Sequence, residues 1–355
     1  MTYVSNDVSM QTTSAIFSLT MGIKIRKSAV FYRLKTSKEW LRWMSKELCE
    51  KESISMPKPE FLEDKNVILV DANDEAVCGS KKSNYSIHYA FDLFQFTSRE
   101  IELTPTKQGE KLSRYRVLPN DIFIADRSYC TMTGIEHVLS GQGDFILRFR
   151  ANAFNLYNEN GDKIDLLSHM RYLNEYESAD IRCFYKLASH ELRPIRIVAM
   201  KKDKVAMEEA KRKMLRNSTR KQRNPAKDAT MEINVYIVLI TSLDYTNAQI
   251  LELYRAPWQI EQVFYRLKSL YQYDDISCKT TETAQTWFYG KLLLSALCEK
   301  LIKNQDFFPS NDWKEALCNS YRRFCNGEAL WFTDNRKSFG NERIRKKQSR
   351  NKGLF

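Results

Sequence analysis

Three acidic residues have the types and positions that metal-dependent chemistry requires. Asp71 and Asp126 each follow an apolar run typical of a buried strand, and Glu261 lies on a helix expected late in the chain. Neighbouring strand ends would bring the two aspartates within a few ångströms, where two unit charges repel by about 4 kcal/mol at ~4 Å and an effective dielectric constant near ~20. Three carboxylates in one place therefore need a cation, and oxygen ligands without Cys or His favour Mg²⁺ or Mn²⁺ over zinc.

Attack on a phosphodiester is the reaction that such a site supports. Two cations held close together can activate a water or hydroxyl group and stabilise the leaving oxygen of an in-line displacement. Taken singly, a strand-end aspartate is more often a turn or cap residue. The three acids together with two basic segments of the chain favour the catalytic interpretation.

The expected helix around Glu261 carries groups that suit nucleic acid. Lys268 lies seven residues after Glu261, on the same face but about 10 Å along the axis, too far for an ion pair and well placed to hold a phosphate beside the metal. Trp258 and Tyr265 share this face, where an aromatic ring can stack on an unpaired base. The alternatives are core packing for Trp258 and an ordinary solvated charge for Lys268.

The charge of the chain is uneven. The formal net charge is +12, and segments 201–227 and 336–352 hold most of the excess Lys and Arg. Such segments fit a polyphosphate partner, because each cation that neutralises a phosphate releases counterions. A solvated helix face and a disordered basic tail are the alternatives for the two segments taken alone.

Other sequence features exclude several classes of protein. Eight cysteines are scattered singly with no C-x-x-C pair, which argues against zinc or redox sites and for free thiols. The longest apolar runs, 233–243 and 292–298, are too short to span a bilayer, and no signal-peptide pattern is present at the N-terminus. We therefore expect a cytoplasmic protein with no membrane partner.

Hydrophobic periodicity predicts the elements that position these residues. Residues 1–60 read as helical, with a helix-turn-helix around Met21-Gly22 and a helix that begins after Ser37 as N-cap. The apolar face expected for this last helix consists of Trp40, Leu41, Met44 and Leu48.

A change of period at Asn66 predicts a mixed α/β sheet. Expected strands are 67–71, 85–96, 100–103, 122–125 and 145–149, with a helix at 133–139. Ligand sites in such sheets favour the carboxyl ends of strands, where both aspartates fall. Residues 151–244 read as an insertion with a hairpin at Asn160-Gly161, strands at 182–187, 195–200 and 233–240, and a basic helix at 205–216. Helices are expected at 247–255 and 281–303.

At these residues the chain resembles bacterial cut-and-paste DDE transposases of the insertion-sequence-four (IS-four) family. The family signature is Y-x-x-R-x-x-x-E-x-x-x-x-x-x-K, and Tyr254, Glu261 and Lys268 keep its register. Segments 66–72 and 124–129 resemble the strands of the two aspartates, the second usually D-R-G-Y, and 145–150 is similar to the strand that follows. The resemblance covers residues 30 to 305.

The resemblance implies an α/β fold: a ribonuclease-H-like mixed sheet with a β-rich insertion domain and an N-terminal helical segment. The boundaries expected from it are a helical DNA-binding segment at 1–60, shortened relative to the family, a first part of the catalytic core at 61–150, the insertion with its basic helix at 151–244, a second part of the core with the glutamate helix at 245–330, and a basic tail at 331–355.

The resemblance also implies the reaction. DNA transposition by such an enzyme is Mg²⁺-dependent cleavage at the ends of an insertion sequence, with Mn²⁺ as a substitute, followed by joining of the freed 3′ hydroxyl to target DNA. The implied partners are double-stranded DNA, at the inverted repeats of the element ends and at the target, and a second copy of the chain in a homodimer at the bacterial nucleoid. Asp71, Asp126 and Glu261 would bind metal, while Tyr254, Trp258, Tyr265 and Lys268 would contact DNA.

Two departures from the family pattern bear on activity. Pro257 stands where the signature has an arginine, which removes a group able to clamp a phosphate with two hydrogen bonds. Ser128 stands where the second motif has a glycine, and we expect this replacement to disturb a tight turn. A catalytically impaired DNA-binding relic and a metal-dependent DNA nuclease on the same fold therefore stay open as alternatives.

Overall fold

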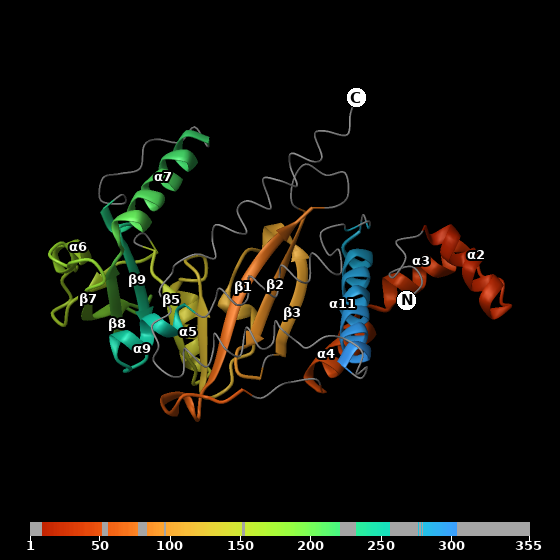
Figure 1. Ribbon diagram of the computed structural model, residues 1–355, viewed down its shortest axis with the longest axis horizontal. Coiled ribbons are helices and arrows are strands. Elements are labelled where there is room, and N and C mark those ends of the chain that lie inside the picture. Colours follow the sequence, from red (N-terminus) through yellow and green to blue (C-terminus); the bar gives the residue numbers. More distant parts are fainter. Residues whose placement is uncertain are drawn as a thin grey trace. The chain divides into compact units, whose positions relative to one another are not determined.

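The computed structural model describes residues 9–51, 56–76, 84–95, 97–150, 153–220, 232–255, 276, 278 and 280–303, without side chains at 49–51, 213–214, 217–220 and 298–303 (Figure 1). In this part of the chain, no helix combines the length and apolar character needed to cross a membrane.

Three helices precede the sheet: α2 (Met10–Met21), α3 (Lys27–Thr36) and α4 (Lys38–Lys51). The turn after α2 is made by Gly22, whose φ of 67° is the left-handed conformation that glycine adopts without strain. The predicted apolar face of α4 is wrong at one position. Leu41 is buried, but Trp40 is 60% exposed, because the buried face continues through Ser45, whose hydroxyl donates to the Tyr289 carbonyl oxygen at 3.1 Å.

Nine strands form one sheet in the order β3-β2-β1-β4-β5-β9-β8-β7-β6 (Figure 1). The first five are β1 (Asn66–Glu75), β2 (Tyr85–Asp92), β3 (Thr97–Pro105), β4 (Asp121–Ala125) and β5 (Asp144–Arg148). β1, β4 and β5 are parallel, while β2 is antiparallel to both β1 and β3. This order of strands, with α5 (Met132–Ser140) between β4 and β5, is the ribonuclease-H-like arrangement, so the predicted fold class is confirmed.

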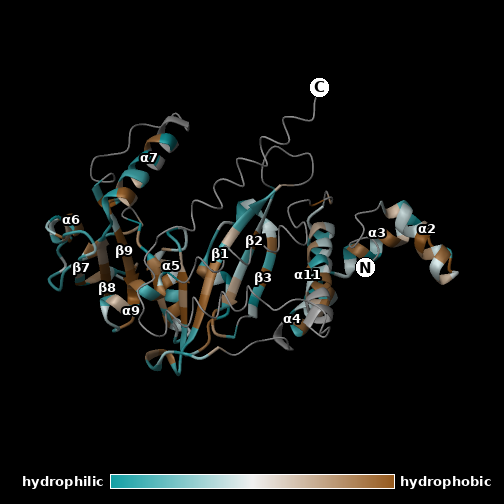
Figure 2. Cartoon of the chain, in the orientation of Figure 1, coloured by the Kyte–Doolittle hydropathy of each residue, from teal (hydrophilic) through white to brown (hydrophobic). Residues whose placement is uncertain are grey.

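The insertion continues the same sheet. Its strands are β6 (Leu156–Tyr157), β7 (Ser178–Lys186), β8 (Leu192–Lys201) and β9 (Tyr236–Thr241), and β9 pairs antiparallel with β5. The hairpin predicted at Asn160-Gly161 is present, with Gly161 at φ 84°. Helices α6 (Leu166–Met170) and α7 (Lys204–Arg220) complete this region, and Figure 2 shows α7 to be largely hydrophilic beside hydrophobic strands.

Among the described residues, a hydrophobic cluster covers one face of the sheet from β1 to the insertion strands. It includes Ile68, Phe123 and Leu147 from the first strands, Ile135 from α5, and Ile197 from the insertion. Since side chains alternate between the faces of a strand, the residues between these core positions point to the opposite face, and Asp71 and Asp126 belong to that set.

The remaining elements are three short 3₁₀ helices and two α-helices: η1 (Glu60–Leu62), η2 (Thr106–Gln108), η3 (Leu112–Arg114), α9 (Asn247–Leu253) and α11 (Thr281–Lys303). α11 covers the free edge of the sheet. Its Gln285 amide donates to the Leu103 carbonyl oxygen of β3 at 2.7 Å, and the Tyr289 hydroxyl donates to the Ile101 carbonyl oxygen at 3.4 Å. A covered edge cannot pair with the strand of another chain.

Candidate active site

Asp71 lies on β1, and Asp126 directly follows β4, the strand that runs parallel to β1. The last register pair between β1 and β4 is Leu69 with Ile124, so each aspartate lies two residues beyond that pair. Neighbouring strands are about 4.8 Å apart, and opposite residues point to the same face. The structure therefore brings together the two acids that the sequence placed at separate strand ends.

Backbone amides hold each carboxylate. The Ala72 amide donates to Asp71 Oδ1 at 2.8 Å, and the Ser128 amide donates to Asp126 Oδ1, also at 2.8 Å. Asp71 is half-buried and Asp126 is exposed. One oxygen of each aspartate thus accepts a hydrogen bond from a backbone amide close to it in the sequence.

The turn after Asp126 accommodates Ser128 without strain. We expected serine in place of the family's glycine to disturb this turn, but Ser128 is not among the residues with positive φ, so the turn needs no glycine. The expectation was wrong for this chain. The Ser128 side chain instead lies near the Glu110 carboxylate and acts to lower its pKa.

Glu110 is a further acid near the site that the sequence did not indicate. It is half-buried in the loop before η3. Burial raises the pKa of Glu110, the Ser128 side chain acts to lower it, and the charges of Asp126 and Asp74 add to the increase. These charges mark Glu110 as part of the acidic surroundings of Asp126.

Positive charge lies on the other side of Asp126. The register of β4 and β5 ends with Ala125 opposite Leu147, so the next pair is Asp126 with Arg148. Burial and the neighbouring charge of Arg148 lower the pKa of Arg127. Two guanidinium groups close enough to repel each other, beside an acid pair, form a place where a phosphate can bind.

Tyr254 reaches the same place from a different part of the chain. Burial raises the pKa of its hydroxyl, and the charges of Arg148, Asp126 and Arg127 act on that hydroxyl from nearby. Of the residues predicted to contact DNA, this one is placed beside the aspartates. Its role stays a prediction.

A capping box fixes the start of the helix that brings Tyr254 to the site. The Gln249 amide donates to Thr246 Oγ1 at 3.3 Å, and the Thr246 amide donates to Gln249 Oε1 at 2.9 Å. The helix α9 begins here and ends at Leu253, and the Tyr254 amide still bonds the Ile250 carbonyl oxygen at 3.0 Å. Ile250 and Leu253 are buried, which holds the helix against the sheet.

Four predicted site residues lie outside the described residues: Glu261, Trp258, Tyr265 and Lys268, as does Pro257. Within the described part of the chain, no three His, Cys, Asp or Glu side chains form a group that could hold a metal ion. Asp71 and Asp126 supply two oxygen ligands, a donor type that fits Mg²⁺ or Mn²⁺. A third carboxylate must come from elsewhere in the chain.

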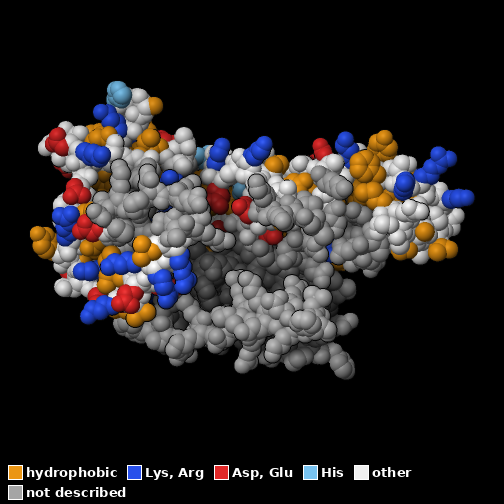
Figure 3. All heavy atoms as spheres, turned by 90° about the horizontal axis from the view of Figure 1, so that it is seen from above, with side chains coloured by type: hydrophobic (Ala, Val, Ile, Leu, Met, Phe, Trp, Pro, Cys, Tyr) orange, Lys and Arg blue, Asp and Glu red, His pale blue; other side chains and the backbone are white. Residues whose placement is uncertain are grey.

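Charged side chains of both signs lie on the surface. Figure 3 shows a small group of Asp and Glu side chains near the middle of this face, and Lys and Arg side chains at the left with Asp and Glu side chains among them.

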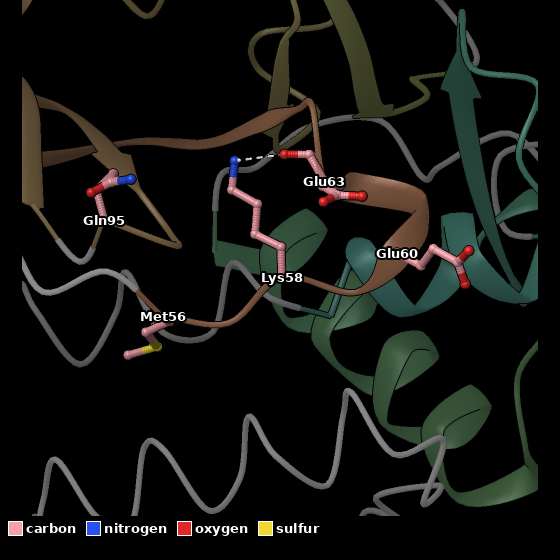
Figure 4. Close-up of a pocket in the computed structure, with 5 residues that line it drawn as sticks. All are labelled: Met56, Lys58, Glu60, Glu63 and Gln95. Atoms are coloured by element: carbon pink, nitrogen blue, oxygen red, sulfur yellow. Dashed lines mark hydrogen bonds between the residues drawn. The ribbon is translucent and has the colours of Figure 1, made fainter.

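A separate cavity of about 540 Å³ is lined by Met56, Lys58, Glu60, Glu63 and Gln95. Lys58 Nζ donates to the Lys65 carbonyl oxygen at 2.5 Å and to the Glu63 carbonyl oxygen at 3.4 Å, a contact drawn in Figure 4. Lys65 precedes β1, so this cavity lies at the end of the strand away from Asp71. The cavity takes no part in the candidate site.

Comparison with known proteins gives a consistent result. A family model described as the transposase DDE domain matches residues 62–297, a range that contains Asp71, Asp126, Tyr254 and Glu261. The chain is 26% identical over 253 residues to the transposase for insertion sequence element IS421 of Escherichia coli, covering 69% of this chain and 68% of that protein. The same identity and coverage are found with InsL of insertion sequence element IS186A of Escherichia coli strain K12.

Proposed function

The chain belongs to the DDE transposase family, and on that premise we propose that it moves an insertion sequence by cut-and-paste transposition. The proposed reaction is hydrolysis of a phosphodiester at each element end, followed by attack of the freed 3′ hydroxyl on target DNA. The observation that supports it is the position of Asp71 on β1 and of Asp126 directly after the parallel strand β4, each two residues beyond the last register pair of the two strands, with Arg127 and Arg148 nearby.

The aspartates act together with Glu261 in this proposal. A bound pair of Mg²⁺ ions, for which Mn²⁺ can substitute, would supply the charge that activates the attacking oxygen and stabilises the leaving one. Asp71 and Asp126 present carboxylate oxygens already oriented by backbone amides, so little reorganisation is needed when the cations bind. Glu261 completes the carboxylate set.

The basic and aromatic groups hold the DNA. In this proposal Arg148, Arg127 and the nearby Tyr254 hydroxyl face the scissile phosphate. Lys268 binds a neighbouring phosphate, and Trp258 and Tyr265 stack on an unpaired base. The described residues of α7 include Lys204, Lys211, Arg212 and Arg216, which suit the DNA backbone beyond the site.

The working unit in this proposal is a homodimer in the bacterial cytoplasm, bound to nucleoid DNA. Two copies of the chain pair the two element ends, each with inverted-repeat sequence, and then join both to one target.

Pro257 favours a second candidate, a DNA-binding relic that no longer cleaves. The proline removes a guanidinium from the family signature, and its ring fits only the start or a kink of a helix. Arg127 and Arg148 lie beside Asp126 and offer a replacement for the missing charge, which is why we place the active enzyme first.

A cleavage and joining assay separates these candidates. The substrate is linear DNA carrying the inverted repeats that flank the element, incubated with purified chain and Mg²⁺, with Mn²⁺ and EDTA in parallel. Asp71→Asn, Asp126→Asn and Glu261→Gln each remove one carboxylate charge, and Asp162→Asn in the exposed turn after β6 is the matched control. Joined product that the control keeps and the three variants lose supports the proposal.

The other outcomes are equally informative. Binding to the inverted repeats without cleavage in Mg²⁺ or Mn²⁺ identifies the relic. Cleavage without joined product identifies a nuclease. Cleavage that survives Asp71→Asn and Asp126→Asn refutes the assignment of the site.

A further inference from the structure

Arg196 on β8 joins segments that are far apart in the sequence. Its guanidinium makes two hydrogen bonds to Asp180 of β7, at 2.9 and 2.8 Å. It also donates to the carbonyl oxygens of Leu243, at 3.1 Å, and Tyr245, and to Asn247 Oδ1 at 2.8 Å. One side chain thus links the insertion strand β7 to residues 243–247, which lead into α9.

The position of Arg196 makes it part of the same face as the aspartates. Across β8, β9, β5, β4 and β1, Arg196 aligns with Leu69, two residues before Asp71. Residues two apart on a strand share a face. Arg196 therefore lies on the face that carries Asp71 and Asp126, three strands away from Asp126.

The helix α9 spans the distance between Arg196 and the acids. It begins at Asn247, which Arg196 contacts, packs on β7 and β8, and ends where Tyr254 meets Arg148. Its seven residues extend about 10 Å at 1.5 Å per residue. Any shift at Asn247 is carried to Tyr254, because a short helix moves as a rigid body.

The contacts of Arg196 hold its guanidinium group in one position and orientation. Its side chain is 12% exposed, and paired, planar bonds to a carboxylate restrict a guanidinium in both distance and angle. Asn247 is held from its other side, since its amide donates to Ser178 Oγ at 3.2 Å. A lysine could keep the charge but could not reach all five acceptor atoms, because its ammonium group has three N–H donors.

We propose that Arg196 is a positioning residue for transposition: it anchors the start of α9 to the insertion strands and so sets the position of Tyr254 beside Arg148 and Asp126. This inference rests on the proposed function. It gives the insertion a role in catalysis that does not depend on contact with DNA.

The test uses the full chain and two measurements. Hydrogen exchange of the amides in 248–254 reports on anchoring without DNA, and cleavage of inverted-repeat DNA with Mg²⁺ gives kcat and KM. Arg196→Ala and Arg196→Lys are compared with Arg182→Ala. Arg182 is the matched control, because it is paired with Arg196 across β7 and β8 and carries the same charge. Its side chain is 81% exposed, and its contact with Asp244, at 3.4 Å, is with a side chain that is 89% exposed, so this ion pair contributes little.

We expect Arg196→Ala to exchange the amides of Ile250 and Tyr254 at least tenfold faster, which corresponds to about 1.4 kcal/mol. We expect kcat to fall at least tenfold with KM changed less than threefold. Arg196→Lys should show both effects, although it keeps the charge. Arg182→Ala should leave exchange and kcat as in the wild type.

Three results would overturn the proposal: unchanged exchange in both Arg196 variants, faster exchange with unchanged kcat, or full rescue by lysine. If Arg196→Ala does not fold, Asn247→Ala removes one acceptor of the anchor and must give a smaller change in the same direction. A wild-type chain that cleaves no DNA refutes the proposed function, and hydrogen exchange alone then decides whether Arg196 anchors α9.

Discussion

His88 should make the stability of this fold depend on pH between neutrality and pH 4. The ring is 1% exposed on β2, opposite Ala72 of β1, and its Nε2 bonds Thr104 Oγ1 at 2.8 Å. Burial lowers the pKa of His88 from 6.5 to about 4, and the nearby Arg114 adds to the decrease. The folded chain thus holds a neutral ring that the unfolded chain protonates readily.

The sign and size of the effect follow from this difference. Since the folded pKa is depressed, the unfolded state binds more protons between pH 6.5 and about 4, and the free energy of unfolding falls as the pH falls through that window. One pKa unit corresponds to about 1.4 kcal/mol, so the loss is about 2 kcal/mol at pH 5 and about 3 kcal/mol at pH 4. His88→Gln removes the titrating group and should cost about 1 kcal/mol at pH 7.

Urea denaturation at pH 7, 6 and 5 measures this. The wild type should be more stable than His88→Gln by about 1 kcal/mol at pH 7, and less stable by a similar amount at pH 5. Thr104→Val is the control: it removes the hydrogen bond but keeps the buried ring, so it should be less stable at every pH with the slope of the wild type. An equal difference between wild type and His88→Gln at pH 7 and pH 5 would refute the reasoning.

Three further predictions concern other polar groups. Asp121 is buried and accepts hydrogen bonds from Arg99 and from the Leu118 amide, each at 2.7 Å. Asp121→Asn replaces one carboxylate oxygen by an NH₂ group, which cannot accept a hydrogen bond from either donor. Urea denaturation should show a free energy of unfolding lower by about 2–3 kcal/mol. The pKa of Glu110 is raised in the folded chain, so the folded state binds the proton more tightly than the unfolded state and the free energy of unfolding falls as the pH rises. In the same assay, Glu110→Gln should be more stable than the wild type at pH 7 and equal to it at pH 4. Tyr254→Phe should slow single-turnover cleavage about tenfold, about 1.4 kcal/mol, because it removes the hydroxyl that lies near Arg148 and Asp126 and would face the scissile phosphate, with thermal unfolding unchanged.

The strands and both aspartates could be predicted because their signals are local. The apolar runs before Asp71 and Asp126 end at an acid, and in a parallel sheet both ends reach the same edge. The boundaries of β1, β4 and β5 differ from the expected ones by a few residues at most. Burial on both faces made these strands read as continuous hydrophobic segments.

Long-range contacts could not be predicted in this way. Glu110 lies in a loop without periodicity, and its relation to Asp126 depends on Ser128, which a family comparison marked as a defect. Arg196 looks like an ordinary outward-facing residue of an alternating strand, since its acceptors come from residues 180 and 243–247. Trp40 has the sequence spacing of a residue on the apolar face of α4. Only the packing of α4 on α11 shows that Ser45 is buried between the two helices while Trp40 is exposed to solvent.

The pairing of β9 with β5 also determines the order in which the chain can fold during synthesis. The strands β1 to β5 emerge from the ribosome first, but β5 stays an open edge until residues 236–241 have been made. That edge carries Phe145, Ile146 and Leu147, all buried in the finished sheet. Exposed apolar edges pair readily with other chains, so the nascent protein should need protection from aggregation until β9 closes the sheet.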